Sequence, residues 1–159
     1  MSDPLDHPAV AKVRAVLAER GATGRIKAFV EPVKTAAAAA AALGCEVGAI
    51  ANSLIFDADG APVLILTSGA HRVNTEAVAE RIGVSALRRA KPDFVKQHTG
   101  QVIGGVAPVG HPAPVATYLD AALRAYPVIW AAGGVGETVF PSTFDELLAI
   151  TGATEIDVE

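Results

Sequence analysis

The side chains with the clearest catalytic potential are the histidines, the single cysteine and a serine in a glycine-containing segment. The four histidines lie far apart, without the H-x₃-H spacing of a zinc site: His7, His71, His98 and His111. Cys45 follows a predicted helix C-terminus, where the helix dipole disfavours a thiolate. The segment TSGAH (67–71) lacks the first glycine of the G-x-S-x-G motif of hydrolases. The side chains therefore predict no metal site, no cofactor and no nucleophile.

The glycine- and proline-rich stretch VIGGVAPVGH (102–111) can act through its backbone instead. It contains Gly104, Gly105, Pro108 and Gly110. Glycine lets a backbone approach a ligand closely, and proline stiffens a loop while removing one N–H group. Such a loop can direct its remaining amides at an oxygen atom, as an oxyanion hole does. A plain turn is the alternative here, just as a β-bulge is the alternative to a ligand contact at Gly133-Gly134.

Hydrophobic periodicity and capping residues predict the elements that position these residues. Helices are expected at 8–20, 36–43, 75–82, 92–98 and 143–151, with Thr35 and Asn74 as caps of the second and third and Ser142 with Asp145 as a capping box of the last. Strands are expected at 26–31, 114–120 and 127–132, and a hairpin at 52–68. VLIL (63–66) in that hairpin is apolar throughout and should be covered on both faces. Because helices and strands do not alternate strictly, the predicted fold is α+β with one mixed, mostly antiparallel sheet.

Length and composition limit the class of protein. The chain has 159 residues, of which 51% are hydrophobic, and this is the size of one domain, here 1–159. No apolar run reaches the ~18 residues of a membrane span, and the N-terminus lacks the pattern of a secretory signal, so a cytoplasmic protein is expected. The net charge of −4 argues against a broad nucleic-acid footprint, but not against contact with one end of a nucleic acid. The central segment concentrates basic residues: Arg72, Arg81, Arg88, Arg89, Lys91 and Lys96.

Five segments, in their order along the chain, match those of a known family and cover nearly the whole sequence. They are FVEPVKTAAAAAAALG (29–44), IANSLIF (50–56), LTSGAHRVN (66–74), TGQVIGGVAPVGH (99–111) and WAAGGVGETVFPSTFDELLAITGA (130–153). Within the fourth segment, Gly104, Pro108 and Gly110 form a G-x-x-x-P-x-G element. The chain resembles the YbaK family, the free-standing relatives of the bacterial prolyl-tRNA synthetase editing (insertion) domain. The resemblance implies a single editing domain with a barrel-like sheet and surrounding helices.

The resemblance also implies an activity. Members of this family hydrolyse aminoacyl-tRNA that carries a wrong small amino acid such as Ala, Cys or Ser, most often on proline tRNA, without a metal or a catalytic nucleophile. Backbone amides of the loop would hold the aminoacyl carbonyl or the terminal adenosine, while a water, aided by the ribose hydroxyl of the tRNA, attacks the ester. The implied catalytic residues are Gly104, Gly105, Val106, Pro108 and Gly110. Positioning and oxyanion stabilisation can suffice for an activated ester.

Asn52 departs from the family pattern, because the corresponding strand position usually carries a lysine that contacts the substrate. An amide can orient a carbonyl group, but it cannot pair with a phosphate as an ammonium does. The candidates to replace this cation are His71, Arg72 and His111, of which His111 directly follows the loop. The departure predicts either altered amino-acid specificity or lost hydrolysis, and lost hydrolysis would leave an adaptor that binds aminoacyl-tRNA or a synthetase. A small-molecule binding protein that reuses the fold is a third alternative.

The remaining substrate contacts are assigned from the matching segments. Phe29, Leu54, Val106 and Phe140 are the expected walls of a small apolar pocket that excludes the proline ring. The full expected substrate-binding set is Phe29, Thr35, Asn52, Leu54, Ser68, His71, Arg72, His111, Gly133, Gly134 and Phe140. The implied partners are the acceptor end of a mischarged tRNA and an aminoacyl-tRNA synthetase. A membrane is not among them, and the resemblance leaves both a monomer and a homodimer open.

Overall fold

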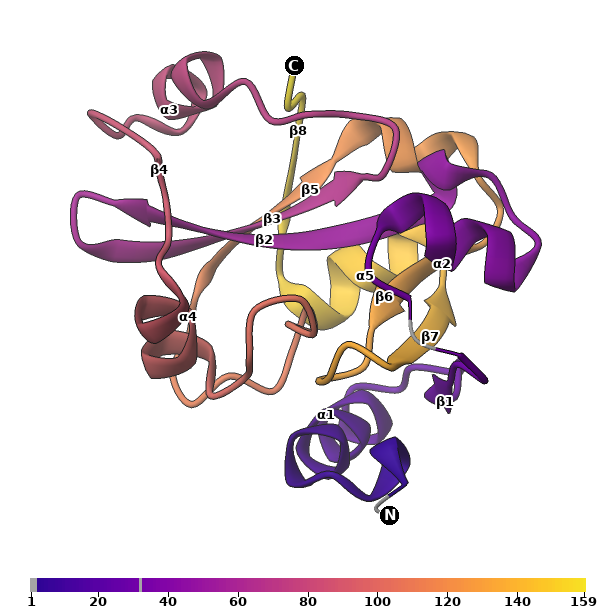
Figure 1. Ribbon diagram of the computed structural model, residues 1–159. Coiled ribbons are helices and arrows are strands. Elements are labelled where there is room, and N and C mark those ends of the chain that lie inside the picture. Colours follow the sequence, from indigo (N-terminus) through magenta and orange to yellow (C-terminus); the bar gives the residue numbers. More distant parts are fainter. Residues whose placement is uncertain (1–2, 32) are drawn as a thin grey trace.

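The computed structural model describes residues 3–31 and 33–159 (Figure 1). Its α-helices are α1 (Pro8–Glu19), α2 (Ala36–Leu43), α3 (Thr75–Ile82), α4 (Pro92–Thr99) and α5 (Phe144–Thr151). Its strands are β1 (Lys27–Ala28), β2 (Ile50–Ala58), β3 (Ala61–Ser68), β4 (Arg88–Arg89), β5 (Ala116–Asp120), β6 (Ile129–Ala132), β7 (Thr138–Ser142) and β8 (Thr154–Ile156). Short 3-10 helices span Pro4–Asp6, Val47–Ala49 and Ala121–Ala125. The α+β class predicted from the sequence is confirmed.

All the strands belong to one mixed sheet with the order β1-β7-β6-β2-β3-β5-β8, and β4 pairs with β2 beside this path. Among the described residues, four strand pairs are antiparallel and three are parallel. The expected barrel-like closure is wrong, because β1 and β8 at the two ends of this order do not pair with each other. The order places β2 directly beside β6, and the candidate site forms at this junction.

The β2–β3 hairpin follows from the sequence. Asp59 and Gly60 form its two-residue turn with positive φ angles of 54° and 92°, and the Asp57 carboxylate accepts a hydrogen bond from the Gly60 amide. The strands pair in register from Ala51–Ser68 to Ala58–Ala61. As predicted, VLIL (63–66) is buried throughout. A shift of the register by one residue would exchange its two faces.

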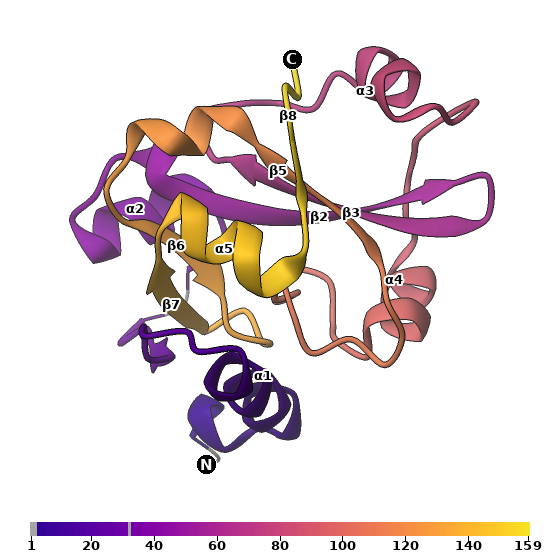
Figure 2. The ribbon, with the colours of Figure 1, turned by 180° about the vertical axis from the view of Figure 1, so that it is seen from behind.

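The core has two parts, one on each side of this hairpin. The larger part includes Leu64 and Leu66 of β3 together with Val13 of α1 and Leu147 of α5. The smaller part includes Val63 and Ile65 with side chains of α3. Figure 2 shows α5 in front of the sheet, and both views place α1 at the edge of the molecule beside β1 and β7. In the described residues, no helix has the length and apolar character required to span a membrane.

Several predicted boundaries need correction. The strand expected at 26–31 is reduced to Lys27–Ala28, although the Phe29 amide adds one hydrogen bond to the Glu137 carbonyl before the chain leaves the sheet. The last helix is capped one residue later than predicted, since the Thr143 hydroxyl accepts the Glu146 amide. Ser142 is instead the last residue of β7, a strand that the sequence did not predict. The predicted caps of α2 and α3, Thr35 and Asn74, are confirmed.

Candidate functional site

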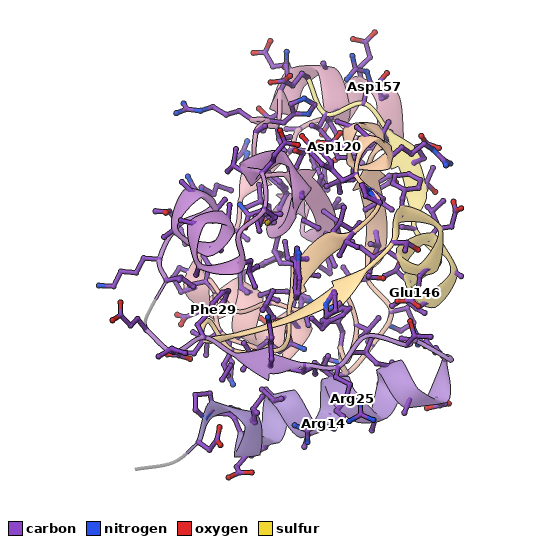
Figure 3. The ribbon with its side chains drawn as sticks, turned by 90° about the vertical axis from the view of Figure 1, so that its right-hand side faces the viewer. Arg14, Arg25, Phe29, Asp120, Glu146 and Asp157 are labelled. Atoms are coloured by element: carbon purple, nitrogen blue, oxygen red, sulfur yellow. The ribbon has the colours of Figure 1, made fainter. Side chains whose placement is uncertain are left out.

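A cavity of about 210 Å³ lies where β2, β6 and β7 meet the start of α2 and the glycine-rich loop. Four stretches of chain contribute its walls, with described lining residues between 29 and 39, at 50–53, between 104 and 106, and between 130 and 139. Its lining residues among those described are Phe29, Val33, Lys34, Thr35, Ala36, Ala39, Ile50, Ala51, Asn52, Ser53, Gly104, Val106, Trp130, Ala131, Ala132, Gly136, Thr138 and Val139. Five of the residues predicted for the site therefore come together here: Phe29 (labelled in Figure 3), Thr35, Asn52, Gly104 and Val106.

The loop beside the cavity is held by its own buried side chains. Gln101, which is only 2% exposed, accepts the Ala107 amide at 2.6 Å through Oε1 and donates to the Val109 carbonyl at 3.2 Å through Nε2. The ring of His111 donates from Nε2 to the Ala107 carbonyl at 2.9 Å. Gln101 was not among the predicted residues, and its place within TGQVIGG was the only signal for it. These bonds fix the loop without involving the cavity-lining amides.

Two backbone amides of the loop are available to a ligand. Gly105 donates to the Val102 carbonyl, Ala107 donates to Gln101, and Pro108 has no N–H group. The amides of Gly104 and Val106 have no acceptor in the described part of the chain, and both residues line the cavity. Gly104 has φ of +92°, a conformation that favours glycine. Among the described lining residues, the amides of Gly104 and Val106 are therefore free to bind a ligand.

Gly105 sets the position of these donors, because its Cα packs directly against another wall of the cavity. A Cβ atom on Gly105 would lie 2.5 Å from the Cα and carbonyl carbon of Val135 and 2.6 Å from the amide nitrogen of Gly136. Real Cβ atoms do not approach backbone this closely, so any side chain here must separate the loop from 135–136. Glycine is therefore required at position 105 for the loop to pack closely against 135–136. Pro108 and Gly110 lie further along the loop and do not line the cavity.

The polar side chains of the cavity are nearly all uncharged. The Thr35 hydroxyl is occupied as the N-cap of α2, and the Thr138 hydroxyl donates to the Val135 carbonyl. The Ser53 hydroxyl is buried and has no hydrogen-bond partner among the described residues. Among the lining residues, Lys34 alone carries a titratable side chain. Ser53 and Lys34 are neighbours of the predicted residues Asn52 and Thr35, but the sequence did not single them out.

The other residues predicted for the site do not line this cavity. Leu54 packs against the smaller core part, and Phe140 is fully buried in the larger one. Gly133 packs against Ile26 and Thr138, and Gly134 packs against the backbone of α1 at Ala9.

A separate polar cluster accounts for Ser68, His71 and Arg72. The Asp120 carboxylate, labelled in Figure 3, accepts the Ser68 amide at 3.0 Å and lies 2.9 Å from His71 Nδ1. The Ser68 hydroxyl donates to the Gly48 carbonyl, and the Arg72 amide donates to the Glu159 carboxylate. None of the three lines the cavity.

The surroundings of Cys45 and of the possible metal ligands do not favour catalysis by these side chains. Burial raises the pKa of the Cys45 thiol, which disfavours the reactive thiolate. In the described residues, no three side chains of the metal-binding types gather closely enough to hold an ion. Among the described lining residues, the polar groups of the cavity are therefore backbone amides, hydroxyls, the Asn52 carboxamide and the Lys34 ammonium.

His111 predicts a pH dependence of stability. Burial lowers the pKa of His111 from 6.5, against the effect of its hydrogen bond to Ala107, and the nearby charges of Lys12 and Arg20 lower it further. The unfolded chain thus binds a proton more readily than the folded one, so this group reduces stability as the pH falls below 6.5. Urea titrations between about pH 7.5 and pH 5 should show a smaller loss of stability in His111→Gln than in the wild type. Equal losses in both proteins would contradict this role.

Comparisons with known proteins agree on one family. A family model described as the aminoacyl-tRNA editing domain matches residues 30–150. The chain is 32% identical to the uncharacterised protein YwhH of Bacillus subtilis over 69% of each chain. It is also 34% identical to the proline–tRNA ligase of Bacillus licheniformis, over 67% of this chain but only 18% of the ligase. A crystal structure of a protein proposed to be a trans-editing enzyme for prolyl tRNA synthetase superposes with a TM-score of 0.90 and 40% identity, covering 96% of this chain and 98% of the other.

Proposed function

Because the chain belongs to the aminoacyl-tRNA editing domain family, we propose that it is a free-standing deacylase that hydrolyses the ester of a mischarged aminoacyl-tRNA. The observation that carries this proposal is the pair of unpartnered amides at Gly104 and Val106, within the described residues, in the wall of a small cavity. Hydrogen-bond donors fixed before the substrate arrives stabilise a developing oxyanion without a reorganisation cost. The substrate is the acceptor end of a tRNA, and proline tRNA is the tRNA that the related proteins suggest.

In the proposed reaction a water molecule attacks the carbonyl carbon of the aminoacyl ester. The amides of Gly104 and Val106 donate to the carbonyl oxygen as it becomes negative, and Gly105 and Pro108 hold the loop in place. The bond between the carbonyl carbon and the ribose oxygen then breaks, which releases the free amino acid and the tRNA. No carboxylate or histidine lines the cavity among the described residues, so the adjacent ribose hydroxyl of the tRNA relays the proton of the water to the leaving oxygen.

The cavity suits a small amino acid. Its volume is about 210 Å³, and alanine side chains from α2 and β6 form part of its wall. Phe29, Trp130 and Val139 supply larger apolar surfaces around them. The uncharged Asn52 amide and the Ser53 hydroxyl, which has no partner among the described residues, can bind a polar side chain or the α-amino group. We therefore propose Ala, Cys or Ser as the substrate side chain, and we expect the proline ring to fit these walls less well than a small acyclic side chain.

Asn52 also supports a second candidate function. Without a cation at this strand position, the cavity can bind an acceptor end and still fail to hydrolyse the ester, which would make the protein an adaptor for aminoacyl-tRNA or for a synthetase. This candidate predicts saturable binding of tRNA or synthetase without turnover. An Asn52→Lys variant distinguishes the deacylase from the adaptor. If the wild type does not hydrolyse the ester and the variant does, the adaptor is supported. If the wild type hydrolyses the ester well and the variant does so less, the adaptor is contradicted.

The direct test is a deacylation panel. The purified protein is incubated with proline tRNA that has been charged with Ala, Cys, Ser or Pro. Loss of each ester is followed against a buffer control. We expect hydrolysis of at least one of the first three and little of Pro-tRNA. An absence of release above the control for every substrate would overturn the deacylase proposal and leave the adaptor.

A further inference from the structure

We propose that Lys34 binds a phosphate group of the acceptor end at the mouth of the cavity; this inference rests on the proposed function. Lys34 is the titratable residue of the cavity lining in the described part of the chain, and its side chain is exposed. None of the described carboxylates lies within 4.0 Å of its ammonium group. Its charge is therefore not neutralised by the described part of the protein.

The position of this charge fits a phosphate better than the aminoacyl group. The interior of the cavity offers amides and hydroxyls, whereas the one ammonium lies on the stretch that leads into α2. An aminoacyl ester carries its own α-ammonium group, which a second ammonium would repel. The phosphodiester that precedes the terminal ribose is the anionic group nearest to the ester. A lysine is a compact, flexible point charge, which suits one phosphate at a solvent-exposed position.

The other basic side chains do not take this role. Arg88 and Arg89 belong to β4 and Lys91 and Lys96 lie at α4, and none of them lines the cavity. Lys27 is close to the cavity, but its ammonium lies over the ring of Trp130, 4.8 Å from the ring centre. Their charges can attract tRNA from a distance, whereas Lys34 can contact the bound end directly.

The first experiment measures deacylation of the tRNA that the wild type hydrolyses best. We expect Lys34→Gln to raise KM about fivefold with little change in kcat, because an exposed ion pair contributes modestly and acts on binding. Lys34→Arg should retain wild-type KM. Lys12→Gln is the matched control, since it removes the same charge from an exposed position on α1 that does not line the cavity.

The second measurement is the affinity for uncharged proline tRNA as a function of salt, which does not require hydrolysis. Loss of one phosphate contact should reduce the slope of log K against log salt by about 0.7 to 0.9 in Lys34→Gln and leave it unchanged in Lys12→Gln. If the wild type hydrolyses tRNA but Lys34→Gln leaves both KM and the slope unchanged, the Lys34 inference is wrong and the deacylase stands. If the wild type hydrolyses nothing, the deacylase fails, and the salt slope alone decides the role of Lys34.

Discussion

A Gly105→Ala variant should lose about 100-fold in kcat/KM for deacylation, because misplacing a catalytic donor by about 1 Å has an effect of this size. The new Cβ would lie 2.5 Å from the backbone of Val135 and must push the loop away from 135–136. That movement carries the amides of Gly104 and Val106 with it. In the proposed mechanism these amides act on the developing oxyanion, so most of the loss should appear in kcat rather than in KM.

The control for Gly105→Ala is Gly83→Ala. Gly83 ends α3 with φ of +78°, a Cβ atom at this position would have no neighbouring atom within 4 Å, and the residue does not line the cavity. Its substitution should reduce stability by about 1 kcal/mol and leave kcat/KM of the folded protein unchanged. Activities are compared at a temperature at which circular dichroism shows both variants folded. If Gly105→Ala has the kcat/KM of the wild type, the loop is a plain turn without a catalytic role.

An Asp120→Ala variant should lose about 3 kcal/mol of unfolding free energy, because one buried carboxylate accepts a buried amide, caps a 3-10 helix and faces His71. Asp120 is 1% exposed and accepts the amides of Ser68 and Ala122 in addition to facing His71. Alanine leaves the Ser68 amide buried without an acceptor and removes the cap of the 3-10 helix Ala121–Ala125. Asp120→Asn, which keeps an acceptor oxygen, should lose less.

Asp145→Ala provides the comparison for this experiment. The Asp145 side chain is 86% exposed and lies 3.5 Å from Arg124, so its removal should change stability by no more than about 0.5 kcal/mol. Urea unfolding followed by circular dichroism measures all three variants. If Asp120→Ala and Asp145→Ala lose the same small amount, the polar cluster of Asp120, Ser68 and His71 does not stabilise the fold.

Local signals in the sequence predicted the elements that are determined locally. The caps of α2 and α3 and the hairpin within 52–68 depend on residues close to one another in the chain, and the sequence predicted them correctly. The sequence did not predict strand β7, and it predicted too long a strand at β1. Each of these strands is defined by its pairing with the other across a long stretch of chain, since Lys27 pairs with Val139. The barrel-like sheet was expected from the family resemblance, and the sequence offered no check on it, since closure of a sheet is not a local property.

The site was predicted only in part for a similar reason. Residues on matching segments were expected to meet, and Asn52, Gly104 and Val106 do so. Ser68 and His71 lie on one such segment as well, but their polar atoms face Asp120, a residue whose buried position was not visible in the sequence. Lys34 was overlooked because a lysine before a helix is an ordinary solvent-exposed residue until the neighbouring cavity is known.

The four separate stretches of chain that line the cavity have a consequence for folding. Phe29 and Val139 both line the cavity, so it cannot form in a partly folded chain that lacks the pairing of β1 with β7. Contacts between distant positions form slowly because of their loop-closure entropy. A ligand in the cavity selects the fully folded chain over all such intermediates, so its binding free energy adds to the stability of the whole fold. Bound substrate should thus protect amides in β6 and β7 from hydrogen exchange together, as one cooperative unit.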